Sequence, residues 1–257
     1  MKRISIRQDL FLFLKQPDYK TMEELTVKSK LLVLFKIYLI TYLGLIIVSL
    51  PLIILQNLEI VGEVTQKTQF IYETIKIDLP SYRPYFLISV ILIVPILEEL
   101  SFRFALDNYN NKFLAISVSI FLGMFLGDYL SKLLWLPNSY LAYFLTYYIY
   151  IVLASGVVYL ILRIDFFKRN FDKIKIVWNS KPGLIFYLIA AFFALLHIIN
   201  LEINTYDLIF FPLIILPYFV GGLSLGYLRV RLGIKYSIIF HVIINGLAFG
   251  LTDLIKH

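Results

Sequence analysis

Seven stretches of about 20 mostly apolar residues dominate this sequence, and each is long enough to cross the hydrocarbon core of a membrane as a helix. They are residues 31–55, 84–106, 113–136, 140–164, 183–200, 207–228 and 234–255. Hydrophobic residues make up 60% of the 257 positions and charged residues 16%, whereas soluble domains have roughly 45–50% and about 25%. A soluble core could not bury this much apolar surface. The sequence therefore predicts an all-α, polytopic transmembrane bundle of about seven spans.

The distribution of lysine and arginine predicts how these spans are oriented. With a cytoplasmic N-terminus, 18 of these residues fall in cytoplasmic segments and four in external ones, while Lys36 and Lys132 lie within spans. Cytoplasmic loops of membrane proteins carry such an excess, and an error in one span would invert every loop after it. The same asymmetry explains the net charge of +7. No basic domain lies outside the spans, so nucleic-acid binding is not expected.

The chain is expected to divide into a short N-terminal segment and one membrane domain. Residues 1–30 are predicted to be cytoplasmic and lack the pattern of a cleaved signal peptide. Their stretch ISIRQDLFLFLKQP fits two alternatives, a helix lying on the membrane surface or a short helix packed on the bundle. Residues 31–257 are predicted to form a single integral membrane domain. The loop RIDFFKRNFDKIKIVWNSKPG, after the fourth span, suits an interfacial helix.

Two adjacent carboxylates and an arginine lie in the second predicted span, at Glu98, Glu99 and Arg103. Ionisable groups inside a span cost about 2.5–3.5 kcal/mol each on insertion scales and normally mark function. Glu99 and Arg103 are four positions apart, so a helix places them on one face where they can pair. Glu98 points about 100° away. We interpret Glu99 as a structural carboxylate and Glu98 as a candidate general base or acid; a charge cluster at the membrane interface is the alternative.

Two further polar positions lie in later spans. His241 and Asn245 are four positions apart, so they share a helix face and could donate to a developing oxyanion. His197 stands alone in the apolar stretch AAFFALLHIIN, where a histidine is more often structural. Asp128 and Lys132 have helical spacing and are expected to neutralise each other. Four glycines have the small-xxx-small spacing of close helix packing: Gly123 with Gly127, and Gly222 with Gly226.

These elements together resemble the membrane-embedded CAAX protease and bacteriocin-processing family (CPBP, or Abi). Its pattern is EExxxR, then FxxxH, then HxxxN or HxxxD, each in a span. The chain has EELSFR from Glu98, FALLH from Phe193 and HVIIN from His241, with a glycine-rich stretch before the last motif. The resemblance extends over about residues 84–255.

The resemblance implies an intramembrane endopeptidase, expected in a bacterial cytoplasmic membrane, that cleaves a peptide or membrane protein within the bilayer. It implies that Glu98 and His197 activate a water molecule, and that His241 and Asn245 stabilise the oxyanion. Three residues are assigned supporting roles: Glu99, Arg103 and Phe193. The substrate stays open between a prenylated C-terminal peptide, a bacteriocin leader and a membrane-anchored signalling peptide. The sequence does not indicate an oligomeric state.

The family resemblance leaves the cofactor open. Zinc is the older proposal, and Glu98, His197 and His241 would be a legitimate ligand set with an open fourth position. A metal-free mechanism uses the same residues through general-base and oxyanion chemistry. We favour no metal, because His241 and Asn245 resemble a donor pair and the HExxH zinc helix is absent. The chain has no cysteine, which excludes disulfides and thiolate ligands.

The spacing of the motifs departs from the family. Glu98 and His197 are 99 positions apart, whereas the family often has a much shorter gap. Two inserted spans restore the original chain direction, so the helices that carry these residues stay antiparallel. At about 1.5 Å per residue, Glu98 and His241 lie roughly 10–12 Å deep and His197 roughly 21 Å. For all three to meet, the fifth span must start later, tilt or bend.

Two other functions are compatible with the sequence. One is a non-proteolytic scaffold or immunity-type protein on the same fold, because a fold does not fix a function. The other is a proton-coupled carrier, because buried Glu and His residues can relay protons. A carrier would be expected to show inverted repeats, and none is evident in the sequence.

Overall fold

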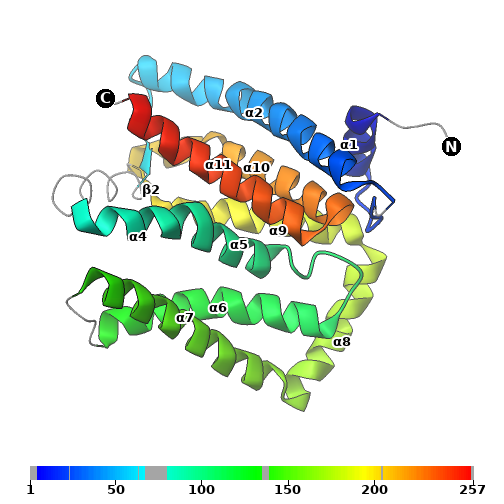
Figure 1. Cartoon of the computed structure of the whole chain (residues 1–257). Coiled ribbons are helices and arrows are strands. Elements are labelled where there is room, and N and C mark those ends of the chain that lie inside the picture. The colour runs from blue at the N-terminus through cyan, green and yellow to red at the C-terminus, as the bar shows by residue number, and fades with distance from the viewer. Residues whose placement is uncertain are drawn as a thin grey trace. The chain divides into compact units, whose positions relative to one another are not determined.

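The computed structural model describes residues 5–22, 24–62, 64–66, 80–134, 139–203 and 205–255. These residues are almost entirely helical (Figure 1). A two-residue antiparallel pairing of β1 (Thr65–Gln66) with β2 (Leu201–Glu202) is a minor addition. The chain forms two compact units. Unit 1 comprises Met1–Asp78 and Gly183–Tyr236, and unit 2 comprises Leu79–Pro182 and Ser237–His257.

Among the described residues, six helical segments are long and apolar enough to cross a membrane. They are Val27–Asn57, Arg83–Phe102, Asn111–Leu133, Tyr140–Leu162, Pro182–Asn200 and Leu208–Leu232. They coincide with the first six predicted spans, so the predicted polytopic helical membrane protein is confirmed. The seventh predicted span corresponds to helix α11 (Ile234–Ile255), which has a shorter apolar part, Ile234–Phe249. The count of seven and the cytoplasmic N-terminus stay predictions.

Unit 1 is built on α2 (Val27–Asn57), α9 (Pro182–Leu196) and α10 (Phe211–Leu232). Thr41 on α2 donates to the Ser224 hydroxyl on α10 over 2.8 Å. On α10, a Cβ added to Gly226 would lie 2.6 Å from the ring of Phe186 on α9. That glycine therefore permits the close approach of α9 and α10, as its small-xxx-small spacing predicts.

The N-terminal helix α1 (Ile6–Lys15) packs on unit 1 through one face. Phe13 is buried, with its ring edge-on to Phe186 and Tyr227 at 4.9 and 5.3 Å. Asp9 accepts hydrogen bonds from the Tyr227 hydroxyl at 2.8 Å and from Arg231 Nε at 3.1 Å. The other face of α1 keeps apolar side chains exposed, so α1 combines a docked face with an exposed one.

Unit 2 begins with one helical rod that has three parts: α4 (Arg83–Ile88), a π-helical segment (Ser89–Ile93) and α5 (Val94–Phe102). The helices α6 (Asn111–Leu133) and α7 (Tyr140–Leu162) follow as a hairpin. A Cβ on Gly127 of α6 would lie 2.8 Å from the backbone of Ile151 on α7. The two inserted spans therefore pack on each other through the predicted glycine spacing.

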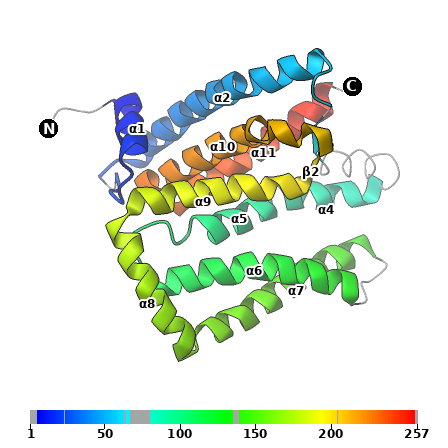
Figure 2. The same ribbon diagram turned by 180° about the vertical axis from the view of Figure 1, so that it is seen from behind.

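The helix α8 (Asp165–Ser180) lies across the ends of α6 and α7 in unit 2 (Figure 2). It is fixed to the loop that follows α5, because Trp178 Nε1 donates to the Asp107 carbonyl at 3.0 Å and the Tyr109 hydroxyl donates to the Phe171 carbonyl. Burial and the nearby Asp172 raise the pKa of Tyr109 to about 12, which keeps this hydroxyl a donor at neutral pH. The loop after α5 is thereby held in place.

Candidate active site

The helix that carries the two glutamates is shaped by Pro95. Just before it, the Val94 N–H bonds to the Ser89 carbonyl, five residues back, which is the π-helical pattern. In the same pattern, the Val90 carbonyl would accept from the N–H of residue 95. That residue is Pro95, which has no N–H to donate. The Asn245 side chain takes this place, and its Nδ2 donates to the Val90 carbonyl over 3.0 Å. This contact fixes α11 against the rod at a π-helical segment, a feature frequent at functional sites.

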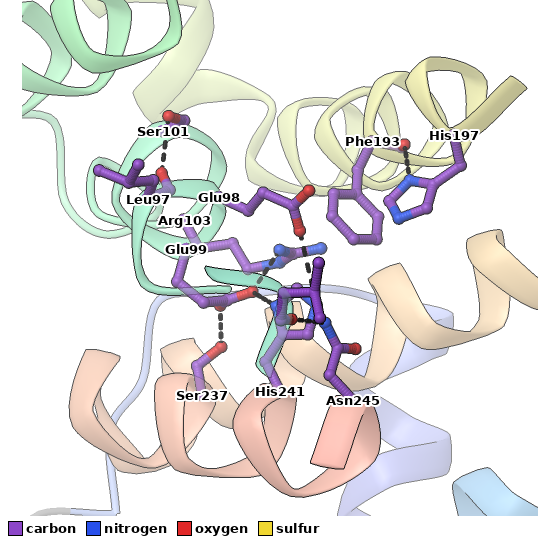
Figure 3. A network of polar contacts seen from close by, with 11 residues as sticks. Leu97, Glu98, Glu99, Ser101, Arg103, Phe193, His197, Ser237, His241 and Asn245 are labelled. Carbon is purple, nitrogen blue, oxygen red and sulfur yellow. Dashed lines mark hydrogen bonds and ion pairs between the residues drawn. The ribbon is translucent and has the colours of Figure 1, made fainter. Parts of the chain in front are cut away.

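Glu99 is completely buried and accepts three hydrogen bonds (Figure 3). Arg103 Nη1 donates to Glu99 Oε1 at 2.5 Å, which is the predicted pairing along one helix face. His241 Nδ1 lies 2.9 Å from the same oxygen. The Ser237 hydroxyl donates to Glu99 Oε2. Since a carboxylate only accepts, these three donors stabilise the ionised form of Glu99.

His241 lies between the two adjacent carboxylates. Because Nδ1 donates to Glu99, Nε2 is the nitrogen that faces Glu98, at 3.5 Å from its Oε2. This distance is longer than a direct hydrogen bond, so Glu98 is held less tightly than Glu99. The side chain of Glu98 is also the more accessible of the two, 17% exposed against 0%. The carboxylates that are adjacent in sequence thus have different surroundings.

The charges of this cluster can cancel in two ways. If Glu98 and Glu99 are ionised and His241 is an imidazolium, their charges and that of Arg103 sum to zero. Moving one proton from His241 Nε2 to Glu98 leaves the sum unchanged. A buried cluster avoids uncompensated charge, because an unpaired ion in a low-dielectric interior is strongly destabilising. Both arrangements therefore leave the four side chains of the cluster without net charge.

The histidine of the FALLH motif, His197, belongs to unit 1, at the start of a 3-10 turn (His197–Asn200) that follows α9. Its Nδ1 lies 2.9 Å from the Phe193 carbonyl, and its ring lies 4.4 Å from the Phe193 ring and 4.6 Å from that of Tyr218. A carbonyl only accepts, so Nδ1 donates and Nε2 is the basic nitrogen of the neutral ring. The approach of His197 to Glu98 stays a prediction, because the two residues lie in different units.

Within each unit taken by itself, the described residues do not assemble a metal site. Among them, no group of three His, Asp or Glu side chains could hold a metal ion. In unit 2, Glu98 and His241 Nε2 supply two donors, while Glu99 Oε1 and His241 Nδ1 bond to each other. The positive charge of Arg103 beside Glu99 also disfavours a divalent cation there. The residues of unit 2 alone would need a third ligand to hold a zinc ion.

Two parts of the cluster were missed by the sequence interpretation. Ser237 lies four positions before His241, so it shares a face of α11 with it, and it is fully buried. Its S-x-x-x-H spacing was the available signal, but a serine in an apolar helix often bonds to its own backbone. The Val90 carbonyl could have been found from Pro95, which removes a donor from the rod.

The exposed pair of Asp128 and Lys132, at 2.6 Å, has the predicted i, i+4 geometry.

Comparison with known proteins agrees with these motifs. A family model described as type II CAAX prenyl endopeptidase Rce1-like matches residues 80–247, which include all three motifs. No curated protein and no solved structure matches the chain. The match covers more than half of the sequence. The chain therefore belongs to the Rce1-like family of type II CAAX prenyl endopeptidases, within the CAAX protease and bacteriocin-processing family that its motifs resemble.

Proposed function

We propose that this integral membrane protein is an intramembrane endopeptidase that hydrolyses a peptide bond of a membrane-embedded substrate by a metal-free mechanism. The observation that carries the proposal is the position of His241 between a fixed carboxylate, Glu99, and a less constrained one, Glu98. A histidine oriented by one acid presents its second nitrogen in a fixed position, which suits it to donate a hydrogen bond to developing negative charge beside a general base. The family points to a peptidase, and this geometry supplies the chemistry that a peptidase needs.

In the first step, Glu98 acts as the general base. Its carboxylate takes a proton from a water molecule while the water oxygen attacks the scissile carbonyl carbon. The C=O double bond opens, and negative charge develops on the carbonyl oxygen. A positioned base of this kind contributes roughly 10²–10⁴-fold to the rate.

The developing oxyanion is stabilised by His241 and Asn245. While Glu98 is ionised, the Nε2–H of the imidazolium faces it. Once Glu98 has taken the proton from water, its attraction for that N–H falls, and the N–H can turn to the oxyanion. The Asn245 amide has two N–H donors; one bonds to Val90 and the second is assigned to the oxyanion. Each such donor is worth about 2.7–4 kcal/mol in the transition state.

Collapse of the tetrahedral intermediate completes the reaction. The C=O double bond re-forms, the C–N bond breaks, and Glu98 returns its proton to the leaving amine nitrogen. Glu99, Arg103 and Ser237 do not touch the reacting atoms in this scheme. They hold the tautomer and the orientation of His241, as the carboxylate does in other acid–histidine pairs.

His197 is assigned to the same water molecule. The bond of its Nδ1 to the Phe193 carbonyl leaves Nε2 as an acceptor for a water hydrogen. We propose that this acceptor orients the water so that its lone pair faces the substrate carbonyl carbon. Phe193, whose ring is buried and contacts that of His197, restricts the rotation of the imidazole.

The proposal is tested by peptide cleavage in proteoliposomes. The probe is a prenylated peptide that ends in a CAAX sequence, and mass spectrometry identifies the products. In water enriched in oxygen-18, the wild-type protein should release the C-terminal tripeptide and place one solvent oxygen in the new carboxylate. Glu98→Gln, which cannot accept the proton, should lower the rate by about 10²–10⁴-fold.

Asp128→Asn is the matched control, since Asp128 is an exposed carboxylate in the same unit and lies outside the site. It should keep the wild-type rate. If Glu98→Gln cleaves as fast as the control, the proposed mechanism is wrong. If the wild-type protein does not cleave the probe, a prenylated CAAX peptide is not its substrate.

A further inference from the structure

A groove on unit 1 shares no lining residue with the proposed catalytic site. It has a volume of about 360 Å³ and is formed by the first turn of α1 and one face of α2. Its lining residues are Ser5, Ile6, Arg7, Lys36, Leu39, Ile40 and Leu43. From these residues we propose that the groove binds an anionic phospholipid, with the headgroup phosphate at Arg7 and Lys36 and an acyl chain along α2.

The basic end of the groove is defined by Arg7 and Lys36. Both side chains are exposed, and neither forms an ion pair with a carboxylate of the described residues. The N-terminus of α1 adds to their positive potential, because its first N–H groups and the helix dipole favour an anion. Ser5 caps this turn by accepting from the Gln8 N–H at 3.2 Å. Two cations and a capped helix N-terminus thus line the same groove.

The position of Lys36 indicates that the anion comes from a lipid. It is the tenth residue of α2, a segment long and apolar enough to span a membrane. A lysine within a span extends its ammonium group toward the headgroup level, where phosphates are found. A free phosphate has no apolar part that could pack against Leu39, Ile40 and Leu43. The groove therefore has the two-part character of an amphiphile, charged at one end and apolar along the rest.

An apolar track leads from the groove along the same face of α2. Residues at spacings of three, four, seven, eleven and fourteen from Lys36 lie on one side of a helix. On this face α2 carries Leu39, Ile40, Leu43, Ile47 and Leu50, of which all but the half-buried Ile40 are exposed. An acyl chain that starts at the phosphate can follow this track, so both parts of the ligand have matching surface.

The test compares lipid binding by the purified full-length protein with native mass spectrometry. The probes are dioleoylphosphatidylglycerol, dioleoylphosphatidylcholine, glycerol 3-phosphate and inorganic phosphate. The wild-type protein should retain the anionic lipid in preference to the zwitterionic one, and millimolar glycerol 3-phosphate or inorganic phosphate should not displace it. The double variant Arg7→Gln with Lys36→Gln should weaken binding of the first molecule of dioleoylphosphatidylglycerol to the protein by about tenfold or more.

The matched control is Lys173→Gln with Lys175→Gln, which removes the same charge from two exposed positions on α8. This control variant should bind the first molecule of dioleoylphosphatidylglycerol as strongly as the wild-type protein does. Three results would each overturn the proposal: equal retention of both lipids, an unchanged affinity in the α1–α2 variant, or an equal loss in the α8 control. Displacement by inorganic phosphate would assign the groove to a free anion instead. Correct folding of the variants is checked by helical content, and Arg231 and Phe13 still hold α1 in place.

Discussion

At the scale of single residues, the adjacent carboxylates of Glu98 and Glu99 differ in their hydrogen-bond partners and in their exposure. Three donors surround Glu99, and no solvent reaches it. Glu98 is partly exposed and faces the second nitrogen of His241 over a longer distance. Rotation by about 100° per residue along a helix is enough to separate the two environments. The pair therefore combines a carboxylate fixed by three donors with a second one that is less constrained.

Removal of Arg103 should destabilise the protein far more than removal of Lys132, although both pair with an acid four residues before them. Arg103→Ala leaves the buried Glu99 without its cation, which costs about 3–5 kcal/mol. Lys132→Ala breaks an exposed pair, which is worth about 0–1 kcal/mol. Unfolding in detergent measures both, and equal losses of stability would contradict the buried role of Arg103.

Asn245 is expected to have a structural and a catalytic role that can be separated. Asn245→Ala should cost about 1–3 kcal/mol, because it leaves the Val90 carbonyl without its donor. In a Pro95→Ala background, the new N–H of residue 95 can donate to the Val90 carbonyl. Asn245→Ala should therefore reduce the stability clearly less in this background. Activity should be lost in both backgrounds. If the stability cost is the same with and without Pro95, the proposed capping role is incorrect.

Some of these residue contacts could be predicted from the sequence and others could not. The Glu99–Arg103 pair follows from helical spacing within one element, and it is present. The contact of His241 with both glutamates joins residues about 140 positions apart, and no periodicity within one helix encodes it. The same is true of Ser237, which donates to Glu99 on another helix.

At the scale of elements, the inserted helices α6 and α7 form a closely packed pair. Their contact depends on Gly123 and Gly127, where a side chain would meet the backbone of α7. Lipid supplies no hydrophobic force between helices, so close packing of small residues is what holds such a pair together. An even number of added spans can therefore be accommodated as a self-contained hairpin beside the site helix.

Gly127→Ala should weaken this hairpin, because its Cβ would lie 2.6 Å from the Ile151 side chain and 2.8 Å from its backbone. Overpacking of this kind costs about 1–3 kcal/mol. Gly156→Ala on α7 is the control, since no heavy atom lies within 4 Å of its added Cβ. It should be neutral or stabilising. Thermal unfolding compares the two, and a destabilised control with an intact Gly127→Ala would reverse the interpretation.

The spans were the most predictable elements, because twenty consecutive apolar residues have few alternatives to a membrane helix. Six predicted spans coincide with helices. The π-helical segment Ser89–Ile93 was not predicted. It depends on Pro95 and on the Asn245 side chain of α11. The sequence around the segment contains Pro95 but not Asn245. The end of the second span at Phe102, earlier than predicted, reflects the turn that begins at Arg103.

At the scale of the whole molecule, the family motifs are divided between the two units. Unit 2 holds EELSFR and HVIIN, and unit 1 holds FALLH. The cytoplasmic N-terminus, one membrane domain over residues 31–257 and a bacterial cytoplasmic membrane remain proposals. So does the convergence of His197 with Glu98. Because the chain has no cysteine, single cysteines introduced at loop positions can report the orientation by labelling from either side.

The most direct measurement compares Glu98→Gln with Glu99→Gln, for both peptide cleavage and unfolding. Both substitutions replace a carboxylate by an amide of equal size, one position apart. Glu98→Gln should lower kcat/KM by about 10²–10⁴-fold and leave the unfolding midpoint unchanged. Glu99→Gln should lower the midpoint, because Arg103 and His241 lose the negative charge that they share. Full activity of Glu98→Gln, or a loss of stability equal to that of Glu99→Gln, would contradict the division of labour between the two glutamates.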